Sequence, residues 1–174
     1  MRFSNKLFGE IFDEFDKAKT REARIAVLRF YEGNRWFVEF LNYAFNPKIH
    51  FDVYKVPLYK PSPDPAGLAV TNLSNEMRRL YIFIVGHPKR TAKLDPKKEE
   101  RIIGLLLNSL HKDEAALLSK LLSKDKDLKI KYLTISLVKE AFPKMPFELP
   151  ESEQVNRLAP MPEKGTITLG DKKA

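Results

Sequence analysis

The chain has 174 residues, of which 43% are hydrophobic and 31% are charged. Such a length and composition are typical of one globular domain and exclude wholesale disorder. The sequence has 31 Lys and Arg against 23 Asp and Glu, a net charge of +8, and no cysteine, which excludes disulfides, thiolate metal sites and cysteine nucleophiles.

The first part of the chain predicts three amphipathic helices. The first runs over residues 4–17 and has its apolar side chains on one face. Thr20 and Asn34 are suited to cap the second and third helices, which end near Gly33 and Pro47. Apolar residues at helical spacing in the third helix predict a core-facing stripe rather than a base-stacking platform: Trp36, Phe37, Phe40, Leu41, Ala44 and Phe45.

The middle of the chain predicts one extended segment and a fourth helix. Residues 49–59 are rich in β-branched and aromatic side chains, and Pro57 limits them to an edge or an isolated segment. A proline-rich connection follows over residues 61–67. We expect the fourth helix to begin near Asn72 and to form a central buried element over residues 80–85.

Three further helices complete the predicted fold. Asp95 followed by Pro96 is a strong start for the fifth helix. The sixth begins near Asp113, and the seventh runs from about Thr134 to Phe142. The fold class is therefore mainly all-α: one bundle of about seven helices over residues 1–149, with a short extended segment near 49–59 and a flexible tail over 150–174.

The positive charge is concentrated in one part of the sequence. Residues 86–131 carry 12 basic and 7 acidic groups, so +5 of the total +8 lies there. A concentrated excess favours a binding face for a polyanion. The candidate DNA-binding residues form two groups, one around each basic stretch: Lys89, Arg90, Lys93, Lys97 and Lys98, then Lys124, Lys126, Lys129 and Lys131.

The order of several motifs resembles the helical DNA-binding domain that precedes the catalytic core in bacteriophage-type ATP-dependent DNA ligases. The similar stretches are LNYAFNPKIHFDVYKVP, NSLHKDEAALLSKLLSKDKDLKIK and TISLVKEAFPKMP, and the resemblance covers about residues 7–146. It implies a helical bundle that sits on duplex DNA through backbone phosphates and the minor groove. Such contacts position a protein on DNA without reading its bases.

Two departures from the ligase pattern limit what the resemblance implies. The family has a glycine after its DLxI turn, where this chain has Lys131. Ligases also carry a Lys-x-Asp-Gly nucleophile, and no such tetrad occurs here, since Lys124–Asp127 lacks the glycine. We therefore expect no ligase activity.

Other catalytic or metal chemistry has no sequence support. The three histidines, His50, His87 and His111, have no second ligand at helical spacing, and no glycine-rich phosphate loop is present. We expect no enzyme activity, no catalytic residue, no metal and no cofactor.

Two functions remain open from the sequence. The first is non-enzymatic binding of double-stranded DNA, as an accessory to a replication or repair ligase or as its competitor. The alternative is a protein–protein interaction adaptor on a ligase-like scaffold, with a replication, transcription or host protein as partner. No apolar run approaches the roughly 20 residues of a membrane span, so we expect no membrane association and a cytoplasmic location, in the host cytoplasm if the protein is viral.

Overall fold

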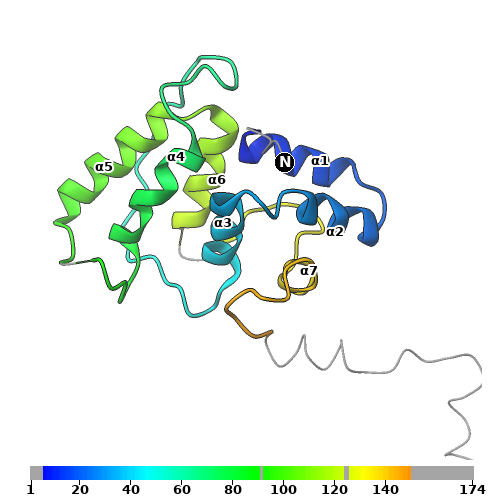
Figure 1. The fold of residues 1–174 in the computed structure, drawn as a ribbon. Coiled ribbons are helices and arrows are strands. Elements are labelled where there is room, and N and C mark those ends of the chain that lie inside the picture. The colour runs from blue at the N-terminus through cyan, green and yellow to red at the C-terminus, as the bar shows by residue number, and fades with distance from the viewer. Residues whose placement is uncertain (1–5, 91, 124–125, 150–174) are drawn as a thin grey trace, which may run out of the picture.

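The computed structural model describes residues 6–90, 92–123 and 126–149. Over these ranges the chain folds into a mainly α-helical single domain without a β-sheet, which confirms the predicted fold class (Figure 1). The elements in chain order are α1 (Phe8–Lys17), α2 (Arg21–Phe30), α3 (Arg35–Phe45), α4 (Leu73–Glu76), the 3₁₀-helix η1 (Met77–Phe83), α5 (Pro96–Ser109), α6 (Lys112–Leu122) and α7 (Ile135–Ala141). The predicted tail over residues 150–174 lies outside the described residues.

Side-chain caps begin five of the helices at the positions expected from the sequence. In each case a side-chain oxygen accepts a hydrogen bond from a backbone N–H in the first turn, which would otherwise lack a partner. The capping residues are Thr20 for α2, Asn34 for α3, Asn72 for α4, Asp95 for α5 and Thr134 for α7. Local sequence therefore sets these helix starts.

Two predicted helices differ from the structure. α1 begins at Phe8, and the predicted start at Ser4 lies outside the described residues. The fourth helix is one α-turn that continues as a 3₁₀-helix. The reason lies in the spacing of its core residues: Met77, Leu80 and Phe83 are all buried and three residues apart, which is the period of a 3₁₀-helix.

The core confirms that the aromatic stripe of the third helix faces inward. Phe37 and Phe40 are fully buried on α3 and pack against Phe8 and Phe12 of α1, with ring centroids 5.4–6.1 Å apart. The rings are tilted or edge-on, which are favourable aromatic geometries. These side chains are therefore not available to stack on bases.

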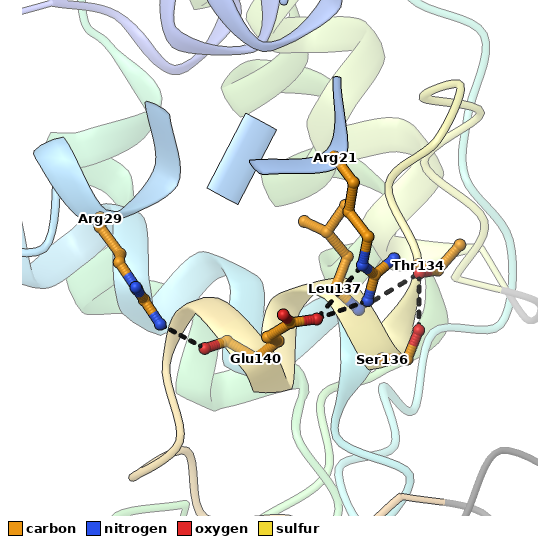
Figure 2. Close-up of polar contacts among 6 residues, drawn as sticks. All are labelled: Arg21, Arg29, Thr134, Ser136, Leu137 and Glu140. Atoms are coloured by element: carbon orange, nitrogen blue, oxygen red, sulfur yellow. Dashed lines mark hydrogen bonds and ion pairs between the residues drawn. The ribbon is translucent and has the colours of Figure 1, made fainter. Parts of the chain in front are cut away.

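Arginines of α2 hold α7 against the bundle, as Figure 2 shows. The Arg21 guanidinium donates to a carboxylate oxygen of Glu140 at 2.7 Å and 3.2 Å. Arg29 donates to the main-chain carbonyls of Glu140 and Ala141 at the last turn of α7, at 3.0 Å and 3.3 Å. A cation at a helix C-terminus pairs with carbonyls that have no partner within the helix.

A buried carboxylate joins the starts of two helices. Glu114 of α6 is 1% exposed, and its side chain accepts hydrogen bonds from the backbone N–H groups of Leu73 at the start of α4 and Phe8 at the start of α1. Burial raises the pKa of Glu114 to about 7, and the nearby charges of Glu10 and Asp113 raise it further, against the lowering effect of the two backbone donors.

This raised pKa predicts that the protein loses stability as the pH rises. The folded state binds the Glu114 proton more tightly than the unfolded chain, whose carboxyl has a pKa near 4.5. The stabilisation is therefore complete below pH 4.5 and is lost as the pH rises through 7, by roughly 2 kcal/mol between pH 5 and pH 7. Urea unfolding at pH 5, 6 and 7 should show this decrease, and Glu114→Gln should remove it. An equal pH dependence in the two proteins would contradict the prediction.

Candidate nucleic-acid interface

The loop between η1 and α5 is held by an acidic residue. Arg90 and Lys93 both contact the Asp52 carboxylate, each at 3.1 Å. The hydrogen bond from Lys93 is the main reason why the pKa of Asp52 lies below its usual range. The Arg90 side chain is only 11% exposed. The Arg90 guanidinium is therefore largely covered and paired with a carboxylate of the same chain, so in this conformation it offers little to the phosphate that the sequence predicts as its partner.

Lys126 is also a structural residue. Its ammonium donates to three main-chain carbonyls at and after the end of α3, those of Tyr43, Asn46 and Ile49, at 3.1, 3.0 and 2.6 Å. Burial lowers the pKa of Lys126. Since an ammonium has three protons to donate, these bonds leave none for a phosphate. In this conformation, therefore, the Lys126 ammonium is directed at the protein's own carbonyls and not at the DNA that the sequence predicts as its partner.

The remaining members of the second group lie on the surface. Lys129 is exposed and pairs with Asp127 at 2.8 Å. Lys131 is exposed, with its ammonium nitrogen 4.9 Å from the centre of the Tyr132 ring. Lys124 lies outside the described residues. Of the described surface members of this group, Lys129 is therefore exposed and paired with a carboxylate, and Lys131 is exposed.

The backbone of this second turn is left-handed at three non-glycine residues, Lys126, Lys129 and Tyr132, with φ of 47°, 57° and 67°. Lys131 is not among them. The conformation that favours glycine is therefore adopted by residues on both sides of Lys131 and not by Lys131 itself.

A basic surface lies on the first half of α5. Lys97 and Lys98 are exposed in its first turns, and Arg101 is exposed one turn after Lys97. Among the residues that the structure describes, none of these three side chains forms an ion pair. Lys89, on the preceding loop, is exposed as well.

Burial of an acidic neighbour makes this face more basic than the sequence suggests. Glu99 lies between the two lysines and Arg101 in sequence, but it is 3% exposed and accepts a hydrogen bond from the backbone N–H of Tyr54 at 3.1 Å. Its carboxylate is therefore bound to the backbone and contributes little exposed negative charge to this surface. Glu100 is the acidic residue of this stretch that stays exposed.

The extended segment predicted near residues 49–59 runs beside α5 in the same direction. Three contacts fix it: Tyr54 to Glu99, Pro57 against Gly104, and the backbone N–H of Lys60 to Asn108 at 2.8 Å. The segment forms no sheet and makes one isolated bridge, from Phe51 to Ile84. It adds two exposed cations beside α5, Lys55 and Lys60.

The candidate residues predicted from the sequence do not include Arg101, Lys55 and Lys60. A signal for Arg101 was present, because it follows Lys97 by four residues and so shares its face on a helix. The two lysines had no comparable signal, since only the tertiary contacts with Glu99, Gly104 and Asn108 bring their segment to α5.

Two of the three histidines have side chains that bind the backbone of their own loop or helix start. The Nδ1 atoms of His87 and His111 accept hydrogen bonds from the backbone N–H groups of Lys89 and Asp113. No group of three or more potential metal ligands occurs among the described residues. Within the same residues, no helix has both the length and the apolar character needed to cross a membrane.

The fold and this surface define a mainly α-helical, single-domain protein with a basic face on α5. The chain belongs to a family of unknown function (DUF6433), whose model matches residues 11–130. The match spans α1 to α6 and includes the basic face, and it ends before Lys131 and α7. No curated protein matches the sequence.

Proposed function

We propose that this protein binds double-stranded DNA without catalysis and that the exposed face of α5 holds the DNA backbone. The observation that supports the proposal is the cluster of exposed cations on α5 and the adjoining segment: Lys97, Lys98, Arg101, Lys55 and Lys60. Cations that have no carboxylate partner in the folded protein keep their full attraction for phosphates.

The binding that this surface supports is largely independent of DNA sequence. Lysine acts as a point charge on a phosphate, and arginine can donate two parallel hydrogen bonds to it. Phosphate contacts fix the position of a protein on the duplex and carry no base information. The ligase-like order of motifs agrees with a role in holding DNA for, or competing with, a replication or repair ligase.

The proposal predicts a steep salt dependence. If all five cations contact phosphates, the logarithm of the association constant should fall with the logarithm of the salt concentration with a slope of about −4.5. Fluorescence anisotropy with a labelled 20-base-pair duplex, titrated between 50 and 300 mM salt, measures this slope. Absence of binding at 50 mM salt, or affinity that does not change with salt, would contradict the proposal.

A protein-interaction adaptor is the second candidate. The observation that favours it is the acidic face of α1, where Glu10, Asp13 and Asp16 are all exposed. Pull-down from nuclease-treated extract separates the two functions. Partners retained after nuclease treatment, and lost in a variant with these three residues changed to Asn or Gln, would favour the adaptor over the DNA-binding protein.

A further inference from the structure

A groove lies between α3 and the segment that follows α7. Its volume is about 480 Å³, and its walls are one face of α3 and residues 142–146. The surface of the groove is mainly apolar, and Val38, Phe142 and Met145 contribute to it. A groove of this size and apolar character is typical of sites that bind small molecules or short peptide segments.

The rim of this groove carries charges of both signs. Two lining residues are acidic, Glu32 and Glu39, and two are basic, Arg35 and Lys144. None of the four side chains forms an ion pair within the described part of the chain. An occupant with an apolar centre and one charge of each sign would therefore complement the groove.

The chain itself contains a segment with this chemistry. Residues 157–163 read RLAPMPE, with Arg157 at one end, Glu163 at the other and five uncharged residues between them. Two of the five are prolines, whose fixed backbone angle reduces the conformational freedom that a segment loses on binding. These residues lie outside the described structure.

The covalent connection keeps this segment within reach of the groove. Pro146 lines the groove, and Leu149, three residues later, is buried and so fixes the chain close by. Arg157 follows Leu149 by eight residues, a length of chain that spans up to about 26 Å. A ligand tethered in this way acts at an effective concentration of about millimolar, which favours it over a free partner.

We propose that residues 157–163 dock in the groove between α3 and the segment that follows α7. Leu158 and Met161 then contact the apolar side chains of the groove, and Arg157 and Glu163 meet its acidic and basic side chains. This docking is separate from the proposed DNA contact, because no residue of the basic surface on α5 lines the groove.

A disulfide reporter tests the docking directly, because the chain has no cysteine of its own. The reporter chain carries Glu32→Cys in the groove and Ala159→Cys in the docking segment. At micromolar protein with oxidised glutathione, we expect a disulfide to form within one chain. Adding Leu158→Ser/Met161→Ser should slow its formation roughly tenfold, since the apolar contacts that hold the segment are lost.

A matched control is Ile167→Ser/Leu169→Ser in the same reporter chain. It removes two apolar side chains from a later part of the same sequence, and we expect the disulfide to form at the unaltered rate. Equal rates in the two double variants would overturn the inference. Since Glu32 is exposed, every reporter chain should unfold at the urea concentration of the unaltered protein.

The position of the reporter gives a second control. Glu100→Cys removes the same charge from an exposed site on α5, and its disulfide with Ala159→Cys should form much more slowly than that of Glu32→Cys. Equal rates at the two sites would contradict docking in the groove. Disulfides between chains that increase with protein concentration would assign the groove to a second copy and overturn the inference. A failure of DNA binding with the expected reporter rates would leave the docking established and reject only the proposed function.

Discussion

Replacement of Lys97, Lys98 and Arg101 by alanine should lower the affinity for duplex DNA by two to three orders of magnitude at about 0.1 M salt. Each phosphate contact contributes about 0.9 to the salt slope, so the slope should become shallower by about 2.7. The three side chains are exposed on α5 and form no ion pair in the described structure. The fold should therefore tolerate the change, and urea unfolding would verify this.

A charge-matched control distinguishes a specific face from net charge alone. Lys17, Lys19 and Lys144 are exposed, and α1, which ends at Lys17, lies across the molecule from α5 (Figure 1). Their replacement by alanine removes the same three charges. We expect this control to keep most of its affinity and slope. Equal losses in the two triple variants would show that DNA responds to the overall charge, and the assignment to α5 would be wrong.

Lys126→Met should destabilise the protein by about 3 kcal/mol. Methionine keeps the length of the side chain but cannot donate to the carbonyls of Tyr43, Asn46 and Ile49, which the ammonium holds together. Hydrogen bonds to a charged donor are individually stronger than neutral ones, and carbonyls left without a partner add a desolvation cost. Urea unfolding measures the loss.

Lys129→Met is the control for this stability prediction. Lys129 lies in the same turn, and its ion pair with Asp127 is 69% and 54% exposed on the two side chains, so the change should cost less than about 1 kcal/mol. The salt slope of DNA binding should not change in Lys126→Met, because the ammonium is directed at carbonyls. A stable Lys126→Met protein with weakened DNA binding would return Lys126 to the group of phosphate contacts.

Local sequence determined where most of the helices begin. The caps Thr20, Asn34, Asp95 and Thr134 satisfy backbone donors within three residues of themselves, so no distant part of the chain is needed to form them. The inward stripe of α3 follows from helical periodicity in the same way. The 3₁₀-helix was not predicted, because an apolar run is compatible with the period of an α-helix and with that of a 3₁₀-helix. Only packing on the core selected the period of three.

The tertiary structure alone decided which charges are available to a partner. The sequence shows Lys126, Arg90, Lys98 and Glu99 as charged residues of one basic stretch. In the fold, Lys126 binds carbonyls, Arg90 binds Asp52, Glu99 turns inward to Tyr54, and Lys98 stays exposed. The physical reason is that each partner lies at least 38 residues away along the chain. The number of charges in such a span can be read from the sequence, but which of them form pairs is decided only when the chain folds. The exposed cations of the candidate interface on α5 are therefore a property of the tertiary structure.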